Sequence, residues 1–156
     1  MPQDLSAVLA DYSAGLDAAM RLLLQLEELA GRQRALPLAT DTHALTALVV
    51  ERQRLLDGLV ALETQLRPLR ERIMGQLDLA RTVPGFQVVS ERHRAVAAAV
   101  ERIMAVDKES LEILQQADAQ RRVDAQSVET AGATLAAYRR VLEGPQGTVG
   151  LVDQRG

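Results

Sequence analysis

Apolar side chains recur at alternating three- and four-residue steps along most of this chain, most clearly in its middle third. That run is interrupted once, at Arg52, and consists of Leu45, Leu48, Leu55, Leu59, Leu62, Leu66, Leu69 and Ile73. The spacing is that of a heptad seam, in which apolar residues line one stripe of a long helix. Because a stripe of this length has to be covered by other long helices, the pattern predicts helix-on-helix packing.

The same period extends to both sides of this run and predicts three helices. We expect them over residues 4–30, 43–81 and 88–142, so that residues 1–142 form one helical domain. Four glycines lie within residues 143–156, a composition that predicts a flexible tail.

Short polar residues and glycines mark the expected ends of these helices. Asp4 is placed to cap the first helix, and Gly31 is placed to end it. Asp41 or Thr42 is expected to cap the second helix, and Ser90 is a candidate cap for the third.

Two prolines affect the second helix and its end. Pro68 lies inside the expected helix and removes one backbone donor, but the apolar register continues unchanged beyond it. We therefore expect one helix with a kink rather than two helices with a loop. Pro84 and Gly85 form the strongest break in this part of the chain and predict a tight turn.

Short connections favour antiparallel neighbours, so we expect an all-α fold, a long antiparallel three-helix bundle or coiled-coil rod. Helices of these lengths leave the third helix unpaired over residues 129–142. Packing of Tyr138 against the connection at residues 31–41 is one interpretation of this overhang. The other is a docking surface for a partner helix. The larger side chains of the overhang, which stand among small ones, are Leu135, Tyr138, Val141 and Leu142.

Composition and charge exclude several classes of function. The net charge is −3 with both signs interspersed, so the basic stripe that a nucleic-acid binder needs is missing. Without Cys, the chain has no disulfides, thiolate metal sites or Cys nucleophile. No basic segment precedes an apolar one at the N-terminus, and the apolar stretches are far shorter than a membrane span. We expect a cytoplasmic protein with no nucleic-acid partner and no membrane insertion.

Candidate chemistry is sparse. His43 and His93 are the only histidines, and neither has the spacing of a metal-binding motif, so we expect both at the surface. Ser90 lies near His93, but no orienting acid or oxyanion donor is apparent. We therefore expect no enzyme activity, no metal and no cofactor. The apolar side of the third helix also carries three charged residues, Asp107, Asp118 and Arg121. Asp118 and Arg121 are either exposed or a buried specificity device.

Residues 35–70 resemble the central signature of FlgN-type flagellar export chaperones. In that signature a short connection containing Asp precedes a Leu-rich helix that carries one basic residue and a Leu-Glu pair. Gly132 and Tyr138 near the end of the last helix, and the Gly-rich tail, are also similar to the family. The residues that match the signature are Asp41, Leu45, Leu48, Arg52, Leu55, Leu56, Leu59, Leu62 and Glu63.

The resemblance implies a binding protein rather than an enzyme. Such chaperones are small cytoplasmic helical proteins that hold hook–filament junction subunits unassembled and deliver them to the export gate of the flagellar type III system. The resemblance implies contact with the export gate at Tyr138. It implies contact with the cargo at Val128, Leu135, Val141 and Leu142.

Two other interpretations of the sequence stay open. The first is a homo-oligomeric coiled-coil structural or scaffold protein, for example a homodimer, in which the overhangs cap each other and no cargo is bound. The second is a helical bundle that holds a cofactor or performs a reaction, which the lack of His, Cys and Glu-x-x-His motifs disfavours.

Overall fold

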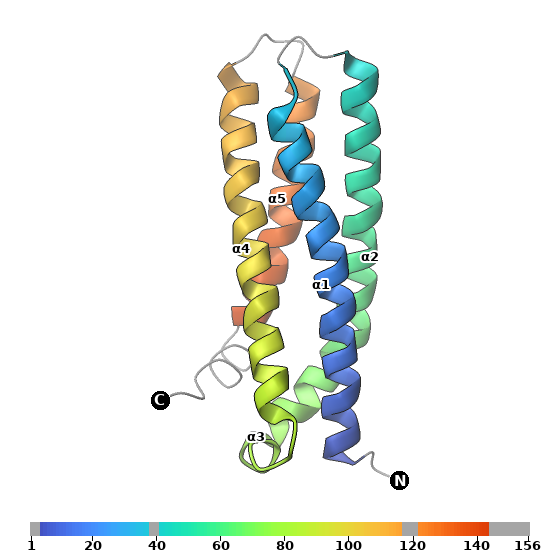
Figure 1. Ribbon diagram of the computed structural model, residues 1–156, viewed down its shortest axis with the longest axis vertical. Coiled ribbons are helices and arrows are strands. Elements are labelled where there is room, and N and C mark those ends of the chain that lie inside the picture. Colours follow the sequence, from blue (N-terminus) through green and yellow to red (C-terminus); the bar gives the residue numbers. More distant parts are fainter. Residues whose placement is uncertain (1–3, 38–40, 117–121, 144–156) are drawn as a thin grey trace.

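The computed structural model describes residues 4–37, 41–116 and 122–143, and these ranges form four long helices and one short helix (Figure 1). No strand is found in these ranges, so the prediction of an all-α helical bundle is confirmed. The elements are α1 (Leu5–Ala35), α2 (Thr42–Gly75), α3 (Leu77–Ala80), α4 (Phe86–Gln116) and α5 (Arg122–Glu143).

The single helix predicted over residues 88–142 is wrong. The chain reverses between α4 and α5, and α5 packs back along α4 (Figure 1). Folding back buries the apolar side of α5, which a straight extension would have left uncovered. The predicted flexible tail beyond Glu143 lies outside the described residues, as do Asp118 and Arg121.

The four long helices form a bundle in which α1 and α4 are neighbours that run in the same direction (Figure 1). α1 packs closely on both α2 and α4, and α5 packs closely on α4. The short helix α3 lies at one end of the bundle, where the chain passes from α2 to α4 (Figure 1). α2 and α5 also neighbour each other, but they touch far less than the other three adjacent pairs.

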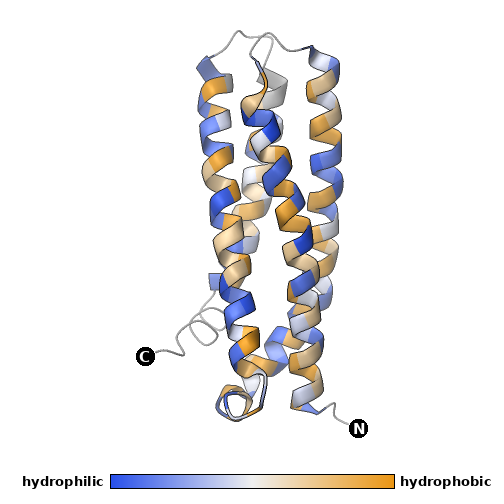
Figure 2. Ribbon diagram, in the orientation of Figure 1, coloured by the Kyte–Doolittle hydropathy of each residue, from blue (hydrophilic) through white to orange (hydrophobic). Residues whose placement is uncertain are grey.

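Leucine dominates the core, and hydrophobic and hydrophilic residues alternate along every long helix (Figure 2). The main cluster joins all four long helices and includes Leu9, Leu23, Leu59, Ile103 and Leu135. A second, small cluster forms where α4 ends and α5 begins, from Leu111, Ala125 and Val128. The apolar packing at this end of α4 and α5 is therefore separate from the main core.

The helix ends follow the predictions in part. Asp41 caps α2, because its side chain accepts a hydrogen bond of 3.2 Å from the backbone nitrogen of His43. Asp4 occupies the cap position of α1, although its side chain makes no capping hydrogen bond. The prediction that Gly31 ends α1 is wrong, since the helix continues for one more turn and buries Gln33. A glycine inside a helix costs only about 1 kcal/mol, which the added packing offsets.

α2 is continuous through Pro68, as predicted, but it ends at Gly75 instead of extending to residue 81. The next residue, Gln76, leaves the helical conformation with φ −133°. The turn before α4 contains Gly85 at φ 96°, a conformation that favours glycine. Ser90 is not a cap, because α4 begins four residues earlier and Ser90 is fully buried inside it.

Among the helices that the structure describes, none is both long enough and apolar enough to cross a membrane.

Candidate binding groove between α2 and α5

The sparse contact between α2 and α5 leaves two cavities, one nearer each end of the bundle. The first, of about 280 Å³, includes Arg52 in its lining, and we call it the Arg52 cavity. The second, of about 300 Å³, includes Tyr138, and we call it the Tyr138 cavity. The two linings lie about one helical turn apart on both helices, and we refer to the two cavities together as the α2–α5 groove. α2 and α5 run in the same direction along it (Figure 1).

The Tyr138 cavity has mainly apolar walls. α2 contributes Val60, whose side chain is 54% exposed although it lies beside the cavity. Glu63 and Arg67 place charges on the α2 side. The residues from α5 follow helical spacing over two turns, and they are Thr134, Ala137, Tyr138 and Val141. The cavity therefore runs along the helix axes.

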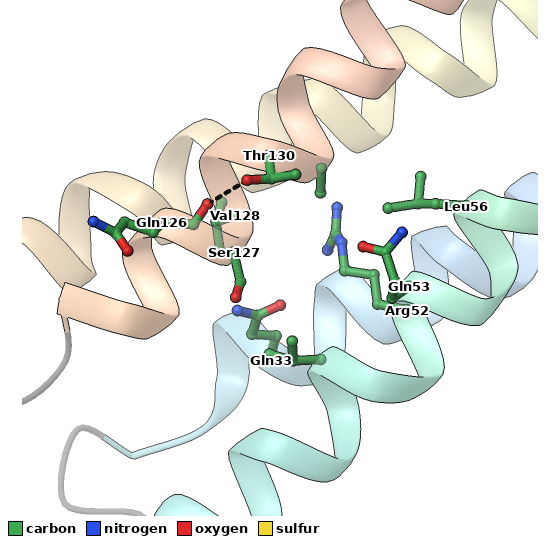
Figure 3. Close-up of a pocket in the computed structure, with 10 residues that line it drawn as sticks. Gln33, Arg52, Gln53, Leu56, Gln126, Ser127, Val128 and Thr130 are labelled. Atoms are coloured by element: carbon green, nitrogen blue, oxygen red, sulfur yellow. Dashed lines mark hydrogen bonds between the residues drawn. The ribbon is translucent and has the colours of Figure 1, made fainter. Parts of the chain in front are cut away.

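The Arg52 cavity is more polar, and α1, α2 and α5 all contribute to it (Figure 3). The guanidinium of Arg52 extends from α2 toward α5, and the amide of Gln33 extends from α1 toward Ser127 (Figure 3). The other lining residues are Val49, Gln53, Leu56, Gln126, Val128, Thr130 and Ala131.

The five residues predicted to contact a partner do not form an exposed overhang. Leu135 and Leu142 are fully buried in the core, because α5 folds back on α4. Val128 is 3% exposed and lines the Arg52 cavity, whereas Tyr138 is 6% exposed and lines the Tyr138 cavity. Val141 is half-buried and also lines the Tyr138 cavity. The expected exposure is therefore wrong, but three of the five residues lie along the groove.

A buried ion pair connects α2 to α4. Arg52 donates to the carboxylate of Asp107, and both side chains are almost fully buried. Burial raises the pKa of Asp107, and the positive charge of Arg52 partly opposes that rise. A buried charge is costly unless it is paired, so loss of either partner of this pair should be strongly destabilising.

A second set of buried polar side chains joins all four long helices. Glu63 accepts three hydrogen bonds of 2.6–2.7 Å from Arg70 on the same helix. Arg70 also donates through Nε to the hydroxyl of Tyr12 on α1, at 3.4 Å. That hydroxyl lies 3.4 Å from Nδ1 of His93 on α4, whose Nε2 lies 3.3 Å from the carbonyl oxygen of Leu142 on α5.

The directions of these hydrogen bonds define the state of His93. Because the Tyr12 hydroxyl accepts from Arg70, its own proton is available for Nδ1 of His93. Nε2 then carries the imidazole proton and donates to Leu142, so the ring is neutral. The prediction that His93 lies at the surface is wrong, since it is fully buried, whereas His43 is exposed as predicted.

Burial sets the protonation of these groups. It lowers the pKa of His93 to about 4, with a further lowering by the nearby charge of Arg70 and an opposing effect of the bond to Leu142. Burial raises the pKa of Tyr12 to about 12, and it also raises the pKa of Tyr138. For Glu63, burial raises the pKa, against the lowering effect of Arg70. At neutral pH both tyrosines are therefore protonated and His93 is uncharged.

Neither of these two buried polar clusters was predicted from the sequence. A usable signal was present for one of them, since Arg52 and Asp107 each interrupt an apolar stripe on a different helix. Two opposite charges at interrupted core positions are typical of a buried pair. Tyr12, His93 and Arg70 gave no comparable signal, because they are far apart in sequence and meet only in the folded bundle.

No group of three or more His, Asp or Glu side chains that could hold a metal ion is found among the described residues. The chain matches no family model, no curated protein and no solved structure in comparisons with known proteins.

Proposed function

We propose that this protein is a cytoplasmic export chaperone of the FlgN type, which binds an amphipathic helix of a hook–filament junction subunit before secretion. The observation that carries the proposal is the α2–α5 groove. It lies at the sparsest of the adjacent helix interfaces and contains an elongated, mainly apolar cavity with an exposed valine beside it.

An amphipathic helix suits this groove because a third helix can lie along two neighbouring helices that run in the same direction. The lining residues of α5 span about 10 Å along the helix axis, which matches two turns of a bound helix. Apolar residues at positions i, i+3 and i+7 of such a helix would contact Val60, Tyr138 and Val141. Glu63 and Arg67 would flank the polar edge of the bound helix.

The resemblance of residues 35–70 to the chaperone signature supports the same function. Its matching residues include the cap residue Asp41, the ion-paired Arg52 and Glu63 of the polar network. We propose that Leu135 and Leu142 hold α5 in place and that the exposed parts of the groove contact the cargo. Tyr138 is nearly buried, so gate contact through its side chain would need α5 to shift.

The test is a binding titration with a synthetic peptide that contains the C-terminal helix of a hook–filament junction subunit from the same genome. Val60→Asp and Val141→Asp should each weaken binding at least tenfold, because each places a charge beside the apolar cavity. Val88→Asp is the matched control, since this valine is 46% exposed on α4 and does not line the groove. Equal affinity for all three variants, or no binding of any such peptide, would contradict the proposal.

The alternative interpretation, a homo-oligomer, was based on an overhang of the third helix. The described helices leave no such overhang, because α5 folds back on α4. Sedimentation at micromolar concentration nevertheless separates the two functions. A monomer that forms a one-to-one complex with the peptide supports the chaperone. A stable dimer that Val60→Asp dissociates would show that a second copy occupies the groove.

A further inference from the structure

The Arg52 cavity contains buried hydrogen-bond donors that have no acceptor. Arg52 is 4% exposed and donates to Asp107 through Nη2, but its Nε and Nη1 have no hydrogen-bond partner within the described part of the chain. Nε2 of Gln33, a residue that is 8% exposed, also lacks a partner. Both residues line the cavity (Figure 3). An unpaired buried donor costs about 1–3 kcal/mol, and more when the group is charged, so this arrangement favours a bound acceptor.

The other side chains of the cavity do not supply that acceptor. Among the described residues that line it, Arg52 is the only charged one. The amide of Gln53 donates to Asp57 at 2.8 Å, and the hydroxyl of Thr130 donates to the backbone oxygen of Gln126 at 3.0 Å. The volume of about 280 Å³ far exceeds the ~30 Å³ of one water molecule, so a small group fits inside.

We propose that the Arg52 cavity binds a carboxylate group, through Arg52 and the amide of Gln33. A carboxylate has only acceptors, which matches a site whose uncommitted buried groups are all donors. It also brings a single negative charge. A phosphate dianion would bring about two negative charges next to a single guanidinium that already pairs with Asp107, so it would be opposed more strongly than a carboxylate.

Two sources can supply the carboxylate: a free small carboxylic acid, or an acidic side chain of a helix that lies in the α2–α5 groove. Only the second source depends on the proposed chaperone function. The site itself depends on Arg52 and Gln33 and would remain if no junction subunit binds.

The first experiment follows the Nε–Hε resonance of Arg52 in the full-length protein by NMR at pH 6 while sodium acetate is added. The expected result is a saturable shift with a midpoint in the millimolar range, absent when sodium chloride is added at the same ionic strength. Arg54 is the internal control, because it is exposed and pairs with Glu51 on the same helix. A shift of Arg52 that does not saturate and equals that of Arg54 counts against a site for free acids.

Variants test which groups form the site. Gln33→Leu should weaken acetate binding severalfold without loss of helicity. Arg52→Met alone would leave Asp107 buried and unpaired, so the double variant Arg52→Met/Asp107→Leu is used, which removes both charges together. This double variant should fold, as judged by circular dichroism. The other residues that line the cavity should then show no NMR shift when sodium acetate is added. Acetate binding that survives in the folded double variant would overturn the assignment to Arg52.

The second experiment distinguishes the sources with the junction-subunit peptide and a copy in which every Glu and Asp is replaced by Gln or Asn. A shift of Arg52 with the acidic peptide alone assigns the carboxylate to a bound helix. A response to acetate without a difference between the peptides assigns it to a small acid. If neither acetate nor the acidic peptide moves the Arg52 resonance selectively, the carboxylate site is wrong, even when the peptide binds elsewhere in the groove.

Discussion

Nε2 of His93 on α4 lies 3.3 Å from the carbonyl oxygen of Leu142, in the last turn of α5. Carbonyl groups in the last turn of a helix have no partner within that helix. The imidazole therefore supplies a donor to the end of α5, and through Tyr12 and Arg70 it links α5 to the other three long helices. This contact matters because the other flank of α5, toward α2, is only sparsely packed.

The neutral state of His93 predicts that the protein loses stability in mild acid. The pKa of His93 falls from its usual 6.5 to about 4 in the folded protein, so the unfolded chain takes up a proton first as the pH falls. The stabilisation is complete above pH 6.5 and declines as the pH falls toward 4, by up to about 3 kcal/mol. Urea unfolding at pH 7 and pH 5 measures this change.

Carboxylates also take up protons as the pH falls. The prediction therefore concerns how much the loss of stability between pH 7 and pH 5 differs between variants. His93→Gln can keep both hydrogen bonds but cannot take up a proton, and it should reduce the loss of stability between pH 7 and pH 5. His43→Gln is the matched control on an exposed histidine and should behave like the unchanged protein. The same loss in His93→Gln as in the unchanged protein would show that another group is responsible.

The sequence was sufficient to predict the all-α bundle, because the three-four period of apolar residues is a local property of each helix. It did not show the reversal between α4 and α5. A helix that continues and a helix that folds back have the same apolar period on both sides of the connection. The overlooked signal lies in residues 115–122, where no apolar side chain is larger than Ala. A stretch of that length without a core residue is compatible with a turn.

The candidate site was predicted only in part, for a related reason. Tyr138 and Val141 do lie along the groove, but Leu135 and Leu142 would be equally accessible if α5 were an overhang. Which face of α5 remains partly open depends on its packing against α4. That packing is a tertiary property, and no local pattern encodes it.

Removal of one partner of the buried ion pair should be strongly destabilising. Asp107→Leu leaves the Arg52 guanidinium buried without its counter-charge, and the expected cost is about 3–5 kcal/mol of unfolding free energy. Arg52→Met/Asp107→Leu removes both charges and should recover most of that loss. Urea unfolding of the single and double variants gives the comparison. A double variant as unstable as Asp107→Leu would show that the pair itself, rather than its charge balance, is needed.

The effect on stability of replacing a helical glycine by alanine should depend on the space around its Cα. At Gly132 in α5, the Cβ that alanine would add has no neighbouring atom within 4 Å, so Gly132→Ala should stabilise by about 0.5–1 kcal/mol. At Gly15 in α1 an added methyl group would clash with Cδ2 of the buried Leu66. Gly15→Ala should therefore destabilise by about 1 kcal/mol, because overpacking exceeds the gain in helix propensity. Thermal unfolding of both variants distinguishes these directions.

If Gly15→Ala were as stabilising as Gly132→Ala, α1 and α2 would have to separate or Leu66 would have to rotate at no cost. Gly15→Ala/Leu66→Ala separates the two effects, because the shorter side chain leaves room for the added methyl group. The double variant should lose less stability than the sum of the two single variants.

Pro68 should lower the stability of the folded protein. It is exposed, so its replacement removes no packing, and it lacks the N–H that would bond to the carbonyl of Thr64. Proline inside a helix costs about 3 kcal/mol of stability. Proline also restricts the unfolded chain, and its replacement by alanine loses that stabilising effect, which is about 0.4–1 kcal/mol. Pro68→Ala should therefore raise the unfolding free energy by roughly 2 kcal/mol. Pro84→Ala, in the exposed turn before α4, is the control and should lower it slightly.

A loss of stability in Pro68→Ala would carry a specific meaning. The residues after Pro68 include Arg70, which reaches both Glu63 and Tyr12, and the fully buried Ile73. If a straighter α2 moved Arg70 away from Tyr12, the hydrogen-bond chain to His93 would be interrupted. Pro68→Ala would then also change the difference in stability between pH 7 and pH 5. An unchanged pH response, together with a gain in stability, confirms that Pro68 is tolerated rather than required.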